Sequence, residues 1–459
     1  MSDIYTLGAF AVAIAALVLL IARFKVHPVA TLFLVVVTLG LVLGMGGTKT
    51  VELVSEGFGS TLAKVGLLVI FGCVLGKMLE LSGAAERITV SALTVFPGKR
   101  APWAVAVASV VLGIPLIADT AVVMLIPVVS ALAYRTKISM MKLGPILYIG
   151  AYVMTSLVPP GPGPLAASGL LGVDFGEAML WGTLVALPGI FVATLYLLTI
   201  KTHVDPKPEF VAHLQQPAGG GTGAGAGTGG DGEVEAKRLP PLWMSLVPVL
   251  LPIVLIVVSS YVIDMAELDN AVGGVIAFVG EPTIALFLGC LSALPLFGRA
   301  WNSKETLNDL FEAGLRLAAL PIALTGVGGA LAAVIRDTEV AESVADMIGN
   351  WGVSPIIVPF LVAAAICTIT GSNILGVMTA AAIMEPLAEG LGISMLAIYL
   401  ACGTGAQIMK HANSSGFWVT TTLSNLTVGQ GIRSVGVASA LSGVTGFAIV
   451  YLLYGLGLI

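Results

Sequence analysis

The stretch SLVPPGPGPL, residues 156–165, lies between two long apolar runs. From Pro159 to Pro164 it contains only proline and glycine, so no α-helix continues through it. Unwound backbone is costly in lipid, because its N–H and C=O groups find no water there. Such a break is tolerated at membrane depth only where it is buried in protein or lines a cavity. The stretch therefore predicts a broken helix next to a functional cavity.

The composition is that of an integral membrane protein. The 459 residues are 57% hydrophobic and only 10% charged, whereas soluble domains carry about 25% charge. Apolar stretches long enough to cross a lipid bilayer recur at 4–22, 29–44, 181–199, 242–263 and 436–458. We expect an all-α fold in the membrane.

Charge and cysteine usage narrow the possible partners. A net charge of −5 argues against a nucleic-acid partner. The four cysteines all lie in apolar runs, with no CxxC spacing and no clustered histidines. They indicate buried small side chains, so the sequence predicts no metal and no cofactor.

A polar stretch divides the apolar chain into two halves. Within it, Gly219–Gly232 is nearly all glycine, threonine and alanine, a composition typical of flexible coil. We therefore expect a first membrane repeat at 1–200, a flexible linker at 201–241 and a second membrane repeat at 242–459.

Lysine and arginine placement predicts the orientation. The loop after the first span carries Arg23 and Lys25, and the linker carries Lys201, Lys207, Lys237 and Arg238, so both should be cytoplasmic. The loop 264–281 carries acidic residues but no lysine or arginine, so it should be external. We expect both termini outside the cell (inner or plasma) membrane and the linker 201–241 in the cytoplasm.

The two halves resemble each other. GVDFGEAMLWG at 172–182 matches TVGQGIRSVG at 427–436, and pairing Gly176 with Gly429 sets an offset of 429 − 176 = 253 residues. The same offset carries three further positions onto irregular stretches of the second half: Asp119 onto Ser372, Pro162 onto Ser415 and Gly76 onto Gly329. Combined with the predicted orientations, this indicates an inverted-topology repeat, a feature of secondary transporters.

The charge map also predicts a re-entrant hairpin in each half. The run Trp103–Leu132 is flanked by basic residues on both sides and should turn near Gly113–Thr120. The run Ile356–Leu387 is flanked by acidic residues and should turn at Gly371–Asn373. The two tips would approach the middle of the membrane from opposite sides.

Two broken helices and two hairpin tips would bring four polar patches to one depth. In the second half, Lys410–Gly416 breaks the run Leu396–Asn425 as the proline-rich stretch does in the first. Half-helix N-termini favour a carboxylate there. The predicted substrate-binding residues are Asp119, Thr120, Gly161, Gly163, Ser372, Asn373, His411, Asn413, Ser414 and Ser415. The alternative is that proline and glycine only kink packed helices.

Asp119 is the single residue that most strongly indicates a functional site. It sits in LGIPLIADTAVVML with no other charge nearby, and an intramembrane carboxylate is usually functional. It can carry a proton or orient the cavity, or instead cap the helix that follows. His411 can be a second proton-coupling residue or a hydrogen-bonded packing residue. Lys410 can hold an anionic substrate or extend to the inner interface, and we favour the interface.

These stretches resemble the gluconate permease family, within the wider ion transporter superfamily. The similarity covers most of the chain outside the linker and rests on LGKMLELSGAAERI (75–88), VPPGPGPLA (158–166), VDFGEAMLWGTLVALPG (173–189), GEP (280–282), GSNILGVMTAAAIMEPL (371–387) and HANSSGFWVTTTLSNLTVGQ (411–430). The resemblance implies proton-coupled import of gluconate or a related sugar acid or hydroxy acid. It also implies a scaffold region plus a transport region, a homodimer and an elevator-like motion.

The chain departs from the family pattern at the predicted site. Asp119 stands where members usually carry a glutamate, and Gly161 replaces the histidine of PPHPGP. The chain reads Asn413-Ser414-Ser415 where Asn-Asp-Pro is usual, and Lys410 is an unusual presence.

The sequence favours a secondary active symporter for a small organic anion, driven by protons. A sodium-coupled transporter of the same fold is the alternative, with Ser372, Asn373 and tip carbonyls as ligands. A passive channel is a third reading. We expect no enzyme, because the chain has no HExxH, no paired catalytic aspartates and no G-x-S-x-G with partners.

Overall fold

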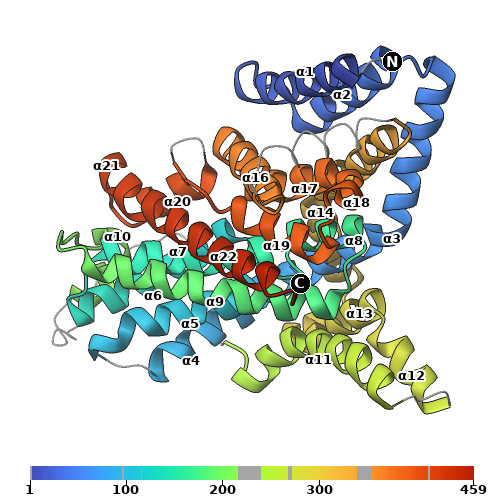
Figure 1. Cartoon of the computed structure of the whole chain (residues 1–459). Helices are drawn as coiled ribbons and strands as arrows, with labels where there is room; N and C mark the ends of the chain where they lie inside the picture. Colours follow the sequence, from blue (N-terminus) through green and yellow to red (C-terminus); the bar gives the residue numbers. More distant parts are fainter. Residues whose placement is uncertain are drawn as a thin grey trace, which may run out of the picture.

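The computed structural model describes residues 3–95, 98–114, 116–215, 239–266, 271–338, 354–411 and 414–459. Within these ranges all regular structure is helical. Figure 1 places α1 and α2 at one edge of the molecule and α11 to α13 at the opposite edge. The two halves thus each contribute a peripheral group of helices.

The first half contains α1 Asp3–Ala22, α2 Pro28–Val42, α3 Gly47–Leu81, α4 Ala84–Val95, η1 Gly98–Arg100, α5 Ala101–Gly113, α6 Ala118–Thr136, α7 Met140–Leu157, α8 Pro162–Leu171, α9 Phe175–Thr199 and α10 Pro208–Gln215. The second half contains α11 Leu242–Ala266, α12 Ala271–Gly280, α13 Pro282–Ala293, η2 Leu294–Asn302, α14 Lys304–Arg336, α16 Ile357–Thr370, α17 Asn373–Met384, η3 Glu385–Leu387, α18 Ala388–Leu391, α19 Met395–Gly405, α20 Ser415–Leu423, α21 Val428–Gly431, η4 Ile432–Gly436 and α22 Val437–Gly455.

The predicted class of all-α integral membrane protein is confirmed. Eight of the described helices are long and apolar enough to cross a membrane, or up to nine if the bent pair Gly273–Gly280 and Pro282–Gly298 forms one span. Many of these helices expose large apolar side chains outward, such as Leu184 and Phe191 on α9. That pattern is expected where lipid, not water, is the outer solvent. All four cysteines are buried and free, as the sequence predicted.

Local sequence signals set several helix ends. Ser139 Oγ accepts a hydrogen bond from the Met141 N–H at 3.2 Å at the start of α7. Asp174 Oδ1 accepts from the Glu177 N–H at 3.0 Å at the start of α9. Both are short polar side chains that satisfy unpaired donors of a first turn. Gly371 ends α16 with φ +74°, a conformation that glycine adopts without strain.

Helices α3 and α14, which the offset relates, pack against each other in opposite directions. Gly57 in α3 lies against the backbone of Gly329 in α14, whereas Val74 lies against Gly314. An early residue of each helix thus meets a late residue of the other. Small residues allow this close backbone approach, which is how helices associate tightly in lipid.

Helices α9 and α22, also related by the offset, are antiparallel as well. Gly189 lies against the Ser442 carbonyl, and Ser442 is the residue at the offset of 253 from Gly189. Further along, the Tyr196 hydroxyl donates to the Arg433 carbonyl at 2.6 Å. The two helices therefore cross at two residues that the offset relates to each other.

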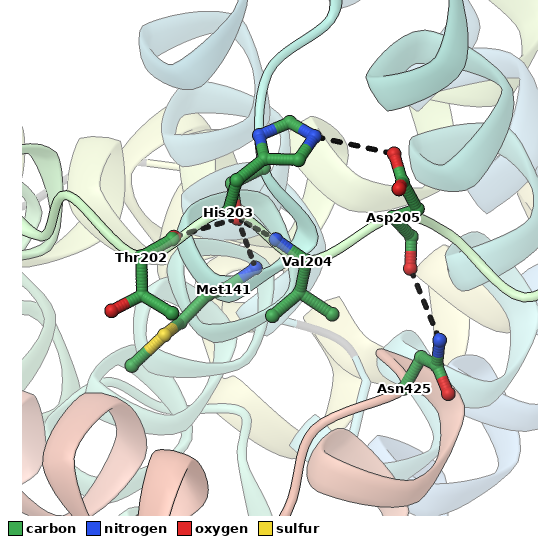
Figure 2. A network of polar contacts seen from close by, with 7 residues as sticks. Met141, Thr202, His203, Val204, Asp205 and Asn425 are labelled. Carbon is green, nitrogen blue, oxygen red and sulfur yellow. Dashed lines mark hydrogen bonds and ion pairs between the residues drawn. The ribbon is translucent and has the colours of Figure 1, made fainter.

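Part of the predicted linker is held against the helices. Ser139 Oγ donates to the Thr202 carbonyl at 3.2 Å and accepts from the Val204 N–H at 2.9 Å. Asn425 Nδ2 donates to the Asp205 carbonyl at 3.3 Å, and His203 pairs with Asp205 at 3.2 Å (Figure 2). Residues 201–215 are therefore fixed to both halves and end in α10, which is not the free coil expected from 201 onward. Gly219–Gly232 lies outside the described residues.

The α3–α14 contact generates a test with a matched control two residues away. A methyl group at Gly57 would meet the Gly329 carbonyl oxygen at 2.5 Å, whereas at Gly59 it meets nothing within 4 Å. We expect Gly57→Ala to destabilise the protein by about 1–3 kcal/mol through overpacking. Gly59→Ala should be neutral or stabilising, because alanine favours helix by about 1 kcal/mol.

Thermal unfolding of the two purified variants in detergent measures this difference. Equal melting temperatures for Gly57→Ala and Gly59→Ala would contradict the described helix contact.

Candidate functional site

The first break lies between α7 and α8. Helix α7 ends at Leu157, just before the stretch predicted to break the helix, and α8 begins within that stretch at Pro162. The Pro159–Pro160 peptide bond is cis. The Leu157 carbonyl accepts from the Tyr399 hydroxyl at 2.6 Å, and Gly161 and Gly163 are buried. The break is thus enclosed by protein, as irregular backbone at membrane depth requires.

The second break lies between α19 and α20. Helix α19 ends at Gly405 and α20 begins at Ser415, and between them the Lys410 N–H donates to Ser439 Oγ at 2.9 Å. Ser414 precedes α20 as its N-cap and is buried. Asn413, predicted as a binding residue, lies outside the described residues.

The tip between α5 and α6 meets the second break. Ser415 Oγ donates to Asp119 Oδ2 at 2.5 Å. The next residue, Gly416, is so close to Asp119 and to the Tyr148 ring that any side chain there would collide with both. The residue before α6 in the N-cap position is Ile117, so the reading of Asp119 as the cap of this helix is wrong. Its carboxylate instead links the first half to the second.

The tip between α16 and α17 meets the first break. Asn373 Nδ2 donates to Ser156 Oγ at 2.9 Å, one residue before α7 ends. Ile374 lies against Gly163, where an added Cβ would be 3.4 Å from its Cα. Ser372 itself caps α17, because its Oγ accepts from the Leu375 N–H at 3.3 Å. Each tip therefore contacts the broken helix of the opposite half.

Lys410 does not extend to a membrane interface. Its side chain is 3% exposed, and Nζ donates to the Gly371 carbonyl at 2.5 Å. The ammonium also lies 4.7 Å from the centre of the Tyr152 ring, within range of a cation–π interaction. The expectation that this lysine reaches the interface is wrong, because the end of α16 is close enough to hold it.

His411 contacts the same helix as Lys410. Its Nε2 is 3.1 Å from the Thr368 carbonyl, in the last turn of α16. The ring is half-buried rather than enclosed. The second break thus directs two adjacent nitrogen-bearing side chains at one helix end.

Two tyrosines that sequence reasoning missed form the wall between the breaks. Tyr148 and Tyr152 are one turn apart on α7, fully buried and stacked at 5.3 Å between ring centres. The Tyr152 hydroxyl donates to the Ala406 carbonyl at 2.6 Å, just beyond the end of α19. Their spacing of four residues was the available signal, but it does not distinguish a site wall from ordinary core.

Thr120 faces a small cavity beside the first break. This cavity of about 20 Å³ is lined by Thr120, Leu116, Pro160 and Pro162, and by the ion pair between Lys77 and Glu80, which are 2.7 Å apart. Such a volume holds about one water molecule, far below the ~300 Å³ of a small-molecule site. Here the first break is closed to a sugar-sized ligand.

Broken helices whose unwound segments meet in the interior of an all-helical membrane protein are typical of membrane transporters. The protein-family model described as GntP family permease matches residues 5–456 of the chain. The chain belongs to this family.

Similar proteins agree with this assignment. The chain is 33% identical to the gluconate permease of Pseudomonas aeruginosa, over 98% of each chain. It is 35% identical to an uncharacterized permease of Haemophilus influenzae, over 89% of this chain and 83% of the relative. It is 27% identical to the Gnt-II system L-idonate transporter of Escherichia coli, over 95% of this chain and 96% of the relative.

A solved structure supports the fold. The crystal structure of the YdaH transporter of Alcanivorax borkumensis, described as having an unusual topology, matches with a TM-score of 0.60. It covers 94% of this chain and 98% of the other, at 15% identity. The similarity therefore concerns the fold alone.

The crossed contact at Asp119 can be tested by disulfide formation in a variant without the four native cysteines. Asp119→Cys with Ser415→Cys should cross-link under mild oxidation, because the native side chains are in hydrogen-bond contact. Asp119→Cys with Ser424→Cys, at the far end of α20, is the matched control and should not.

A protease site inserted in the Gly219–Gly232 segment gives the readout on a non-reducing gel. After cleavage the halves should stay joined only in the Asp119/Ser415 variant. Separation of the halves there, or equal cross-linking of the control, would contradict the geometry.

Proposed function

We propose that the protein is a secondary active symporter that imports gluconate or a closely related sugar acid or hydroxy-carboxylate, coupled to protons. Membership in the GntP permease family supports a transport function. Relatives named for gluconate and for L-idonate support a sugar acid as the substrate. The observation that carries the proposal is that each hairpin tip contacts the broken helix of the other half.

The inverted repeat is part of the proposal. The offset of 253 carries the Asp119–Ser415 pair onto Ser372 and Pro162, and the neighbours of those two residues, Asn373 and Gly163, line the other crossed contact. The antiparallel pairs α3–α14 and α9–α22 agree with this relation. The same offset relates α2 to α13 and α3 to α14, so the contact of α2 with α14 corresponds to the contact of α13 with α3. A single symmetry that exchanges the two halves accounts for all of these contacts.

The substrate is proposed to lie where the breaks and tips converge. Helices α8, α17 and α20 all begin there, and the partial positive charge of a helix N-terminus favours binding of a carboxylate. Hydroxyl and amide groups suited to a polyol come from Thr120, Ser372, Asn373, Asn413, Ser414 and Ser415. Gly161 and Gly163 are buried here, but they have no side chains to cover the backbone of the first break once the regions move apart. Because the cavity beside Thr120 holds about one water, the regions must move apart to admit substrate.

Asp119 is the proposed proton carrier, with His411 as the second candidate. Asp119 is half-buried, and its hydrogen-bond partner Ser415 is exposed, so the carboxylate lies near an accessible edge of the site. Protonation would remove its charge and allow it to donate to Ser415 or to substrate. Sodium coupling remains the alternative, with the tip residues Ser372 and Asn373 and tip carbonyls as ligands.

The remaining expectations concern the whole assembly. We propose a homodimer in the cell membrane with both termini external and the linker cytoplasmic. The scaffold and transport regions are proposed to move relative to each other as an elevator. The contacts that Asn425 and Ser139 make with residues 202–205 support a linker that starts next to both halves.

We expect Asp119→Asn to abolish gluconate accumulation driven by a pH gradient in proteoliposomes. Asparagine keeps the size and can still accept from Ser415, but it cannot carry a proton. The loss should be about a hundredfold or more, as when a proton-transfer group is removed. Counterflow of labelled gluconate, which needs no proton gradient, should persist.

Asp174→Asn is the control, because Asp174 is exposed at the start of α9 and asparagine caps a helix equally well. Its uptake should equal that of the wild type. Undiminished accumulation by Asp119→Asn would remove this carboxylate from the coupling mechanism.

A further inference from the structure

The C-terminal end of α16 lies buried at a hairpin tip. The last carbonyls of a helix have no partner within it and carry partial negative charge. At this end Gly371 turns into the left-handed region and its N–H returns to the Cys367 carbonyl at 2.8 Å. The carbonyls of Thr368 and Gly371 point instead toward the second break. In transporters, half-helix C-terminal ends of this kind coordinate sodium ions or protons.

In this chain a lysine occupies that end. The Lys410 ammonium donates to the Gly371 carbonyl at 2.5 Å and lies over the Tyr152 ring. Its side chain is 3% exposed, so water does not supply the remaining partners of a free charge. A buried ammonium is costly unless it is paired, and here the helix end and the ring face offset that cost.

The groups around the ammonium come from three packed elements. They are Asp119 on α6, Tyr152 on α7 and Cys367 on α16, with His411 next to Lys410 in the chain. Tyr148 stacks on Tyr152 behind them. Asp119 attracts Lys410 electrostatically but bonds to Ser415. The ammonium is thus turned toward the helix end and not toward a direct carboxylate partner, which argues against Lys410 as the primary substrate anchor.

The equivalent end in the first half is neutral. There the Thr155 hydroxyl lies 3.4 Å from the Gly113 carbonyl and 3.2 Å from the Leu116 carbonyl at the α5–α6 tip. The residue that the offset of 253 relates to Lys410 is Leu157, which has no charge. That hydroxyl has a single proton, and its shortest contact is with the Ala151 carbonyl of its own helix at 2.6 Å. The two tips therefore differ: a fixed cation binds the end of α16, whereas no charged side chain binds the end of α5 among the described residues.

We propose that Lys410 is a tethered cation that permanently fills the ion position at the end of α16. This inference rests on the proposed symport function and deepens it. With its own ammonium in place, the second half takes no mobile coupling cation, and transport is independent of sodium. The mobile ion is then taken up only in the first half, next to Asp119.

The test uses the purified full-length protein and three variants. Lys410→Ala removes the charge and leaves space for an ion, whereas Lys410→Met removes the charge but keeps the length of the side chain. Lys142→Ala is the matched control, because Lys142 Nζ also donates to a late helix carbonyl, that of Leu198 at 2.9 Å, away from the breaks. Melting temperature with sodium or choline chloride reports ion binding without requiring transport.

The melting temperatures of the wild type and of Lys142→Ala should be the same in sodium chloride and in choline chloride. Lys410→Ala should melt lower in choline and recover in sodium, because the ion then takes the vacated position. A saturating rise of wild-type melting with sodium would overturn the proposal. So would a Lys410→Ala protein that melts alike in both salts.

Gluconate uptake in proteoliposomes supplies the second arm. Lys410→Met should lose about tenfold or more of wild-type uptake, since the carbonyls at the helix end lose their partner, while gluconate still raises its melting temperature. Full uptake by Lys410→Met would overturn the proposal. If Lys410→Ala does not fold, the uptake of Lys410→Met decides the question alone. If the wild type transports no gluconate, the symport proposal fails, but the melting arm still tests the ion position.

Discussion

Everything in this protein depends on how unwound backbone is satisfied inside a membrane. Two helices stop and restart within apolar surroundings, at Leu157 and at Gly405, and each stop leaves carbonyl and N–H groups without helical partners. The molecule satisfies them with side chains from distant elements. Tyr399 donates to the Leu157 carbonyl and Tyr152 to the Ala406 carbonyl at these two stops. At the tip between α16 and α17, Lys410 donates to the Gly371 carbonyl in the same way. These bonds are buried, so losing one would leave a carbonyl without water to replace it.

The same constraint explains why the halves interlock. A hairpin tip needs polar partners at membrane depth, and the break in the opposite half offers them, so Asp119 pairs with Ser415 and Asn373 with Ser156. Each half thus supplies a polar partner to the tip of the other half. In the proposed mechanism, movement of the regions parts these shared polar groups, and a substrate carboxylate takes their place.

Much of this arrangement could be predicted from the sequence. Proline cannot continue a helix interior, so the end of α7 before Pro159 and the turn at Gly371 followed from residue type. Helix α8 begins at Pro162, inside the proline-rich stretch, because proline is tolerated in the first turn of a helix. The offset between the halves followed from short matching stretches. The direction of the Lys410 side chain could not be predicted, because a long flexible chain points wherever its tertiary neighbours allow. The wall formed by Tyr148 and Tyr152 and the contacts of residues 202–205 with Ser139 and Asn425 depend on long-range packing in the same way.

Cryo-electron microscopy of the protein in lipid nanodiscs with gluconate tests the central claim most directly. The account predicts ligand density between the two breaks, within contact of Asn373 and Ser415 and near the N-termini of α8 and α20. It also predicts that both breaks are enclosed by protein. Density elsewhere with the breaks empty, or breaks that face the lipid chains, would contradict it.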